Sequence, residues 1–135
     1  MTVFGIGIDV VENARIADLI RNHGQRFLNR VYQPGEIDYC QSMREPAPHF
    51  AARFAAKEAI SKAFGTGFAQ RINWRDIEVR RKASGEPFIV LHSGAAELAK
   101  RLNIETVLVS LSHSQAYAVA NALLLKGAEP ASLRE

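Results

Sequence analysis

The sequence predicts an α+β fold in which helices pack on one side of a mainly antiparallel sheet. Three observations indicate it: a strand-like segment opens the chain, helical segments fill the first half, and strand-like segments dominate the second half. Residues 3–10 alternate apolar residues with glycine or aspartate, which is typical of a strand. The apolar face carries Phe4, Ile6 and Ile8. The opposite face has two glycines, which we expect to leave room for a bulky ligand near the backbone, and ends in Asp9.

Helical periodicity recurs through the first half of the chain. Gly24, Pro34 and the pair Pro46 and Pro48 separate the helical segments, and Gly65 ends the last of them. The helices are expected at residues 13–22, 26–32, 36–43 and, the longest, 49–64.

Strand-like segments dominate the second half of the chain. A turn containing Ser84 and Gly85 separates the first two strands, and residues 113–115 form the turn between the last two. We expect strands at 77–81, 87–91, 106–112 and 116–125, with a helix at 94–102. Residues 1–125 thus form one domain, and residues 126–135 form a polar C-terminal tail.

Composition narrows the class of protein. Apolar residues make up 47% and charged residues 23% of 135 residues, as in globular domains. The longest apolar stretch, residues 116–125, is far shorter than the ~20 residues that span a bilayer, and the N-terminus lacks the basic segment of a signal peptide. A single cysteine, Cys40, excludes an internal disulfide. We expect a cytoplasmic protein without a membrane partner.

The charge balance is mildly basic, with a net charge of +3 and a pI near 9.3. The one dense basic run, residues 80–82, is too short to indicate a nucleic-acid partner. A nucleic-acid-binding module remains an alternative on pI alone, but the predicted sheet faces lack aromatic residues interleaved with Lys and Arg.

The long helix is apolar nearly all round, which predicts a buried helix. Its large residues form one stripe: Phe50, Phe54, Ile60 and Phe64. Alanines cover the opposite side, at positions 51, 52, 55, 56, 59 and 63. The last strand offers a matching face of small residues, Ala116, Ala118, Ala120 and Ala122.

Glu58 lies at the edge of the alanine face and needs a metal, a cation or a proton there. Spacing alone favours a surface pair with Lys62, one turn further on. Asp9 suggests another interpretation, because two carboxylates from a strand and a helix suit a hard, oxygen-preferring ion such as Mg²⁺. Lys62 would then neutralise phosphate charge, and the turn of Gly65 and Thr66 could present N–H groups to the same anion.

Four segments together resemble one known family. They are GIGIDVVENAR (residues 5–15), RFAAKEAISKAFGTG (residues 53–67), the SGEP turn (residues 84–87) and SLSHSQAYAVA (residues 110–120). In this order and spacing they are similar to the signatures of the bacterial holo-acyl-carrier-protein synthases. The resemblance covers nearly the whole chain apart from the tail.

The resemblance implies a 4'-phosphopantetheinyl transferase fold and a homotrimer with sites between subunits. It implies transfer of 4'-phosphopantetheine from coenzyme A to a serine of acyl carrier protein, which supports fatty acid biosynthesis. Asp9 and Glu58 correspond to Mg²⁺ ligands, and they would act in catalysis together with Lys62, which contacts phosphate. Glu58, directly or through a metal-bound water, would accept the serine proton.

The same resemblance implies the binding residues for both substrates. The positions that surround coenzyme A are Arg53, Lys62, Gly65, Thr66, Gly85, Pro87, Ser112 and His113. Arg15, Arg21 and Arg26 correspond to the surface that docks an acidic carrier-protein helix. Six residues rotate a helix by about 240°, so Arg15 and Arg21 cannot point the same way on an ideal helix.

Several points stay open on sequence alone. Glu86 departs from the family pattern, and we expect it to point to solvent. His49 either binds phosphate at the start of the long helix or is merely exposed, and we favour exposure. His113 taken alone is typical of a hydrogen-bonded turn residue, and its pairing with Ser112 does not form a serine hydrolase motif. A metal-dependent phosphodiesterase would use the same Asp9, Glu58 and Lys62, so only the resemblance favours transfer.

Overall fold

The computed structural model describes residues 1–65 and 72–128. Strands β1 (Thr2–Glu12), β4 (Ile104–His113) and β5 (Tyr117–Lys126) form an antiparallel sheet in the order β1-β5-β4. Strands β2 (Ile77–Arg81) and β3 (Pro87–Leu91) form a separate antiparallel hairpin. The helices are α1 (Asn13–His23), α2 (Gln25–Val31), α3 (Pro34–Gln41), α4 (Pro46–Phe64) and α5 (Ser93–Arg101), with a 3₁₀ turn, η2 (Trp74–Asp76).

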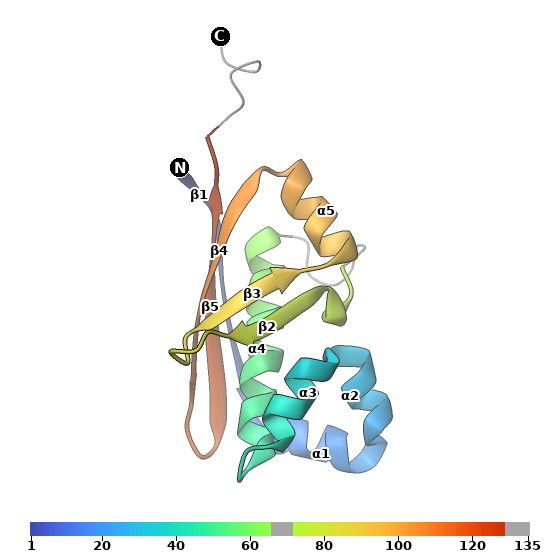
Figure 1. Cartoon of the computed structure of the whole chain (residues 1–135). Coiled ribbons are helices and arrows are strands. Elements are labelled where there is room, and N and C mark those ends of the chain that lie inside the picture. The colour runs from blue at the N-terminus through green and yellow to red at the C-terminus, as the bar shows by residue number, and fades with distance from the viewer. Residues whose placement is uncertain (66–71, 129–135) are drawn as a thin grey trace.

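The helices and the β2–β3 hairpin all lie on one side of the three-stranded sheet (Figure 1). Helix α4 runs along that face and contacts all three strands. Helices α1, α2 and α3 gather at one end of α4, and α5 lies near the other end (Figure 1). The predicted fold class is therefore confirmed, with the second pair of strands in a sheet of its own.

Alanine and glycine bring α4 unusually close to the sheet. The α4 alanines at positions 51, 52, 55, 56, 59 and 63 are buried, and so are Ala118, Ala120 and Ala122 of β5, whereas Ala116 is exposed at the turn. On β1, a Cβ atom at Gly5 or Gly7 would overlap the carbonyl oxygen of Ala63 or Ala59, respectively. The expectation that these glycines leave room for a ligand is wrong: the backbone of α4 fills that space.

The bounds of α4 also differ from the prediction, because the helix begins at Pro46 rather than near His49. Proline is tolerated in the first helical turn, where backbone N–H groups have no partner inside the helix. Gly65 ends α4 with a φ of 84°, a left-handed conformation that glycine adopts without strain.

The outer face of the three-stranded sheet carries large aliphatic side chains that no helix covers, together with the polar residues Ser110 and Asn121. Its exposed side chains include Ile6, Ile8 and Val10 of β1 and Leu108 of β4, with relative exposures of 68%, 63%, 62% and 50%. A folded chain rarely leaves so many large aliphatic groups together in water. None of the helices within residues 1–65 and 72–128 is long and apolar enough to cross a bilayer.

Candidate active site

Two carboxylates meet where β1 crosses α4. Asp9 lies on the inner face of β1, because its neighbours Ile8 and Val10 point outward to the exposed face. Glu58 extends from α4 and is partly buried. Burial raises the pKa of the Glu58 carboxyl, and the nearby charge of Asp9 raises it further, while Lys62 and Arg15 oppose the shift. The two acidic groups therefore share one electrostatic environment.

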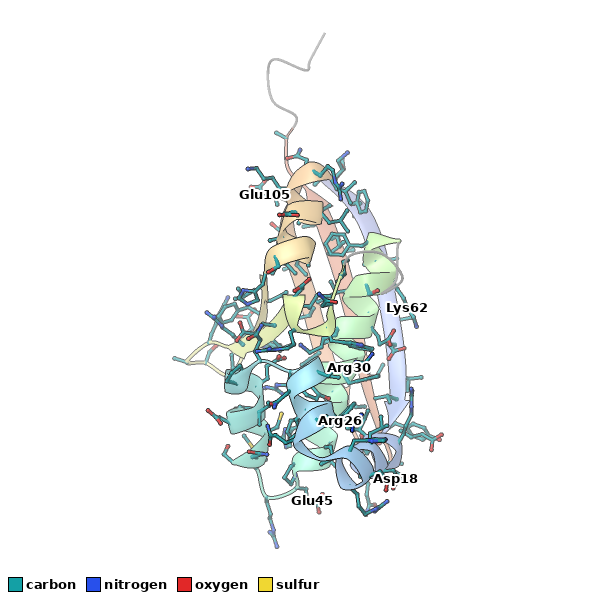
Figure 2. All side chains as sticks on the ribbon, turned by 90° about the vertical axis from the view of Figure 1, so that its right-hand side faces the viewer. Asp18, Arg26, Arg30, Glu45, Lys62 and Glu105 are labelled. Atoms are coloured by element: carbon teal, nitrogen blue, oxygen red, sulfur yellow. The ribbon has the colours of Figure 1, made fainter. Side chains whose placement is uncertain are left out.

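Lys62 completes this group from the next turn of α4. Its Nζ donates to Oδ1 of Asp9 and to the carbonyl oxygen of Ile8, both at 3.0 Å. Figure 2 shows Lys62 on the side of α4 that faces β1. The local pair of Glu58 with Lys62, which spacing alone favoured, is not the ion pair that forms. The lysine instead bridges helix and strand, with 52% of its side chain exposed.

The donor set fits a small divalent cation. Within the described residues no group of three or more His, Cys, Asp or Glu side chains gathers as a metal site. Mg²⁺, however, commonly takes only one or two protein carboxylates and fills its other positions with water and phosphate oxygen. Burial, and after it the charge of Asp9, raises the pKa of Glu58 and so disfavours its ionised form, which a divalent cation beside the two carboxylates would favour.

A second, cationic cluster lies at the other end of α4, around the ring of Tyr39 in α3. The guanidinium of Arg53 lies 4.3 Å from the centroid of this ring, and that of Arg81 lies 5.2 Å from it. The Arg53 side chain is buried, and its Nη1 donates to the carbonyl oxygen of His49 at 3.3 Å. The rings of His49 and His113 pack edge to face, with centroids 5.0 Å apart. The structure thus brings Arg53 and His113 into one neighbourhood.

The remaining predicted coenzyme A positions lie in the β2–β3 turn, at the start of β3, near the end of β4 and at the end of α4. Gly85 has a φ of 91° in the β2–β3 turn, and a Cβ atom there would lie 3.4 Å from Nη2 of Arg81. Pro87 begins β3, and Ser112 is exposed near the end of β4. Gly65 follows Lys62 at the end of α4, at the carboxylate end of the site. Thr66 lies outside the described residues.

Glu86 sits in the same turn and pairs with Lys82, at 3.1 Å between Oε2 and Nζ. Its side chain is 62% exposed, so the prediction that Glu86 points to solvent is confirmed.

The three arginines predicted to dock a carrier protein have different surroundings. Arg15 lies over the ring of Phe54, 5.6 Å from its centroid, and its charge lowers the pKa of Glu58 against the larger effect of burial. Arg21 forms an ion pair with Asp18 of the same helix. Arg26 of α2 lines a pocket together with Leu19, His23, Phe27 and Arg30. Figure 2 shows Arg26 and Arg30 along the same side of α2.

One buried ion pair went unpredicted. Nζ of Lys57 donates to Oε1 of Glu36 at 2.9 Å, and both side chains are fully buried. Glu36 also accepts the backbone N–H groups of Gln33 and Val79, so the pair fastens α3 and β2 to α4. The available signal was weak: Lys57 is one of several charged residues on a mostly apolar helix, and a buried lysine needs a partner.

Comparison with known proteins agrees with this arrangement. The family model of the 4'-phosphopantetheinyl transferase superfamily matches residues 5–122. A holo-[acyl-carrier-protein] synthase from Koribacter versatilis is 48% identical over 122 residues, covering 90% of this chain and 98% of the relative. One from Moorella thermoacetica is 46% identical over 118 residues, covering 87% and 91%.

Solved structures give the same result. The holo-[acyl-carrier-protein] synthase of Neisseria meningitidis superposes with a TM-score of 0.86 at 31% identity, covering 93% of this chain and all (100%) of the other. The Helicobacter pylori enzyme, solved in complex with coenzyme A, gives 0.80 at 32% identity, covering 89% and 99%. The chain therefore belongs to the 4'-phosphopantetheinyl transferase superfamily and, within it, to the holo-[acyl-carrier-protein] synthases.

Proposed function

We propose that this chain transfers the 4'-phosphopantetheine group of coenzyme A to a serine hydroxyl of an acyl carrier protein. The observation that carries the proposal is the convergence of two carboxylates, Asp9 and Glu58, beside the Lys62 ammonium in a chain of this family. A single buried cysteine is compatible with the cytoplasm, the location that we propose.

In the proposed reaction the serine oxygen forms a bond to the phosphorus that carries pantetheine. The bond from this phosphorus to the bridging oxygen breaks, and adenosine 3',5'-bisphosphate leaves with the electron pair. Glu58 accepts the serine proton, directly or through a water, and its raised pKa makes the carboxylate a stronger base. Lys62 offsets the negative charge of the phosphates as a compact cation.

Asp9 and Glu58 are the residues that would hold Mg²⁺. Such an ion supplies charge stabilisation to the pyrophosphate as the phosphorus–oxygen bond breaks. Arg53, Gly65, Thr66, Gly85, Pro87, Ser112 and His113 are proposed as the positions around coenzyme A. No residue of this chain becomes covalently modified in this scheme.

A direct test is to incubate the protein with apo-acyl carrier protein, coenzyme A and Mg²⁺, and then to measure the intact mass of the carrier. We expect the carrier to gain the mass of one phosphopantetheine group. The rival activity, phosphodiester hydrolysis, would release adenosine 3',5'-bisphosphate and leave the mass of the carrier unchanged. That second outcome would refute transfer, although the same site residues could still catalyse hydrolysis.

We further propose that α1 and α2 dock the carrier protein. Of the three candidate arginines, Arg26 has the clearest docking environment. It lines a pocket with Arg30 and Phe27, and no acidic side chain among the described residues pairs with it. The Arg21 charge is already paired with Asp18, and Arg15 also acts on Glu58.

The Arg26→Glu variant is therefore expected to raise the KM for the carrier roughly tenfold at low salt, with the KM for coenzyme A unchanged. The effect should shrink as ionic strength rises, because exposed charges are screened over about 10 Å at 0.1 M. Steady-state kinetics at several salt concentrations measure both constants. The control is Lys100→Glu, the same charge change on α5 at the far end of the molecule (Figure 1). An equal rise of the KM for the carrier in Arg26→Glu and Lys100→Glu would argue against docking at α1 and α2.

We also propose that the active unit is a homotrimer, with the exposed apolar face of the sheet in the subunit contact. Obligate interfaces resemble a hydrophobic core cut in half, and Ile6, Ile8, Val10 and Leu108 form such a surface. A cyclic trimer closes a head-to-tail contact without producing fibres.

A charge on this surface should dissociate the assembly. We expect Ile8→Glu to convert a trimeric protein to monomers, as measured by sedimentation velocity, and to lose most transfer activity if the sites are shared. Lys100→Glu again controls for the added charge and should stay trimeric. A wild-type monomer with full activity would be incompatible with the proposal.

A further inference from the structure

One residue at the start of α1 holds the turn between β4 and β5. This turn, residues 114–116, lies at the end of the molecule where α1, α2 and α3 gather (Figure 1). Nδ2 of Asn13 donates to the carbonyl oxygens of Ser114 and Gln115, at 3.0 and 3.1 Å. The backbone N–H of Asn13 donates to the carbonyl oxygen of Ala116 at 2.9 Å. Asn13 therefore binds three successive carbonyl groups of the turn.

Exposure makes the order of this turn dependent on hydrogen bonds. Residues 112–117 are all exposed, so burial contributes little to holding them. Besides the bonds within the turn and to Tyr117, the hydrogen bonds that reach it from the described part of the chain come from Asn13. Helix α1 has an anchor of its own in Ile16, which is fully buried. Loss of the Asn13 amide should therefore loosen the turn rather than the helix.

The Asn13 side chain carries a cost to stability. The residue is only 5% exposed, and its Oδ1 is buried without a hydrogen-bond donor among the described residues. A buried acceptor without a partner destabilises a fold, and an apolar side chain of similar size would avoid that cost. Conflicts of this kind between a polar group and its surroundings gather at functional sites.

The turn directly follows two of the proposed coenzyme A positions. Ser112 and His113 are the last residues of β4, and both are exposed. The pairing of β4 with β5 ends at His113 opposite Ala118, so the strand ladder does not extend into the turn. A chain segment that becomes ordered only when a ligand binds lowers the affinity for that ligand. The order of the turn therefore bears on donor binding.

We propose that Asn13 is a positioning residue for donor binding. Its amide keeps the β4–β5 turn ordered before coenzyme A arrives, and so holds Ser112 and His113 in the orientation that the donor meets. The inference rests on the proposed function for the identity of the donor and for the roles of these two residues. It gives Asn13 no part in proton transfer, so the expected effect is on donor affinity and not on the chemical step.

Two variants remove the donated bonds in different ways. Asn13→Leu has a similar size and removes the unpartnered oxygen together with the donor. Asn13→Asp keeps the shape of the side chain but offers only acceptors at neutral pH. A carboxylate in the first turn of α1 is favoured by the helix dipole, so this variant should not weaken the helix itself. The control is Asn22→Leu, the same change at an exposed position of α1.

Both Asn13 variants should raise the KM for coenzyme A by roughly five- to tenfold, the effect of ordering about one backbone residue on binding. The values of kcat and of the KM for the carrier should stay close to those of the wild type. Asn22→Leu should keep the wild-type KM for coenzyme A. Titration calorimetry with coenzyme A and Mg²⁺, without carrier, should show the same loss of affinity in both Asn13 variants.

Amide hydrogen exchange measures the order of the turn directly. In both Asn13 variants the amides of residues 113–117 should exchange faster than in the wild type, whereas the amides of α4 should exchange at the wild-type rate. Saturating coenzyme A should slow exchange in this segment more in the variants than in the wild type, because the variants still have to order it.

Unchanged affinity for coenzyme A in both Asn13 variants would overturn the proposal, and so would unchanged exchange at residues 113–117. Faster exchange throughout the chain, with an equal rise of both KM values, would also overturn it, since that would mean a general loss of stability. The intact-mass assay on the wild type tests transfer separately. A protein that binds coenzyme A as described but modifies no carrier would refute the proposed function and leave the role of Asn13 standing.

Discussion

Replacing Glu58 by glutamine is expected to lower the rate of phosphopantetheine transfer by roughly 10²- to 10⁴-fold, the usual contribution of a positioned general base. Glutamine has nearly the same size, so α4 should pack as before, but the amide neither accepts the serine proton nor binds a cation as a carboxylate does. Intact-mass time courses of the carrier protein measure the rate, and circular dichroism checks the fold.

Asp9→Asn should cause a loss of similar size, because the second oxygen ligand and the partner of Lys62 are both weakened. EDTA should abolish transfer by the wild type, and added Mg²⁺ should restore it. Lys100→Gln, on α5, is the matched neutral control and should keep the wild-type rate. Full activity in EDTA would remove the metal from the mechanism, and an active Glu58→Gln would remove Glu58 as the base.

The Glu58→Gln substitution should not destabilise the metal-free protein. Burial and the charge of Asp9 raise the pKa of Glu58 in the folded state above its unfolded value. The folded chain therefore binds more protons than the unfolded chain between these two pKa values, and stability falls as pH rises through that window. Above the window Glu58→Gln removes an unfavourable charge, so its Tm in EDTA at neutral pH should equal or exceed that of the wild type.

The three residues of the carboxylate site could be predicted because strand and helix periodicities place each of them. Asp9 ends the inner face of a strand with period two, and Glu58 and Lys62 share one side of a helix. The ion pair of Lys62 could not be predicted, since local spacing offers Glu58 as a partner. Lys62 pairs with Asp9 because β1 packs closely against α4, and this distance is set by tertiary packing rather than by local spacing.

Gly5 and Gly7 show why a bare strand face is ambiguous. Glycine permits close approach of any backbone, and the sequence does not say whether a ligand or a helix approaches. The alanines of α4 were the missing half of the pattern, because a helix face of small side chains can pack closely on a strand face of glycines. The cationic cluster was only partly foreseen. Arg53 and His113 were candidates by resemblance, whereas Tyr39, His49 and Arg81 meet them only through tertiary contacts.

Lys57 and Glu36 mark the main limit of sequence reasoning, because 21 residues separate them along the chain. Each residue alone resembles an ordinary surface charge. Once α3 and β2 close over α4, both side chains are fully buried and must find each other. The same contact supports the second large prediction.

Lys57→Met is expected to lower the free energy of unfolding by about 3–5 kcal/mol, because it leaves the Glu36 carboxylate buried without its cation. Burial lowers the pKa of Lys57 although Glu36 opposes the shift, so the interior disfavours the charged pair. The double variant Glu36→Gln/Lys57→Met should therefore recover much of the loss. Recovery should be incomplete, because glutamine offers only one acceptor to the N–H groups of Gln33 and Val79. Urea unfolding at a fixed protomer concentration measures the wild type, the single variants Lys57→Met and Glu36→Gln, and the double variant, since assembly would otherwise shift the midpoints. If the free energy of unfolding of the single variants lay within about 1 kcal/mol of the wild-type value, water would have to reach the pair. If the double variant were less stable than either single variant, the charges themselves would hold α3 and β2 on α4.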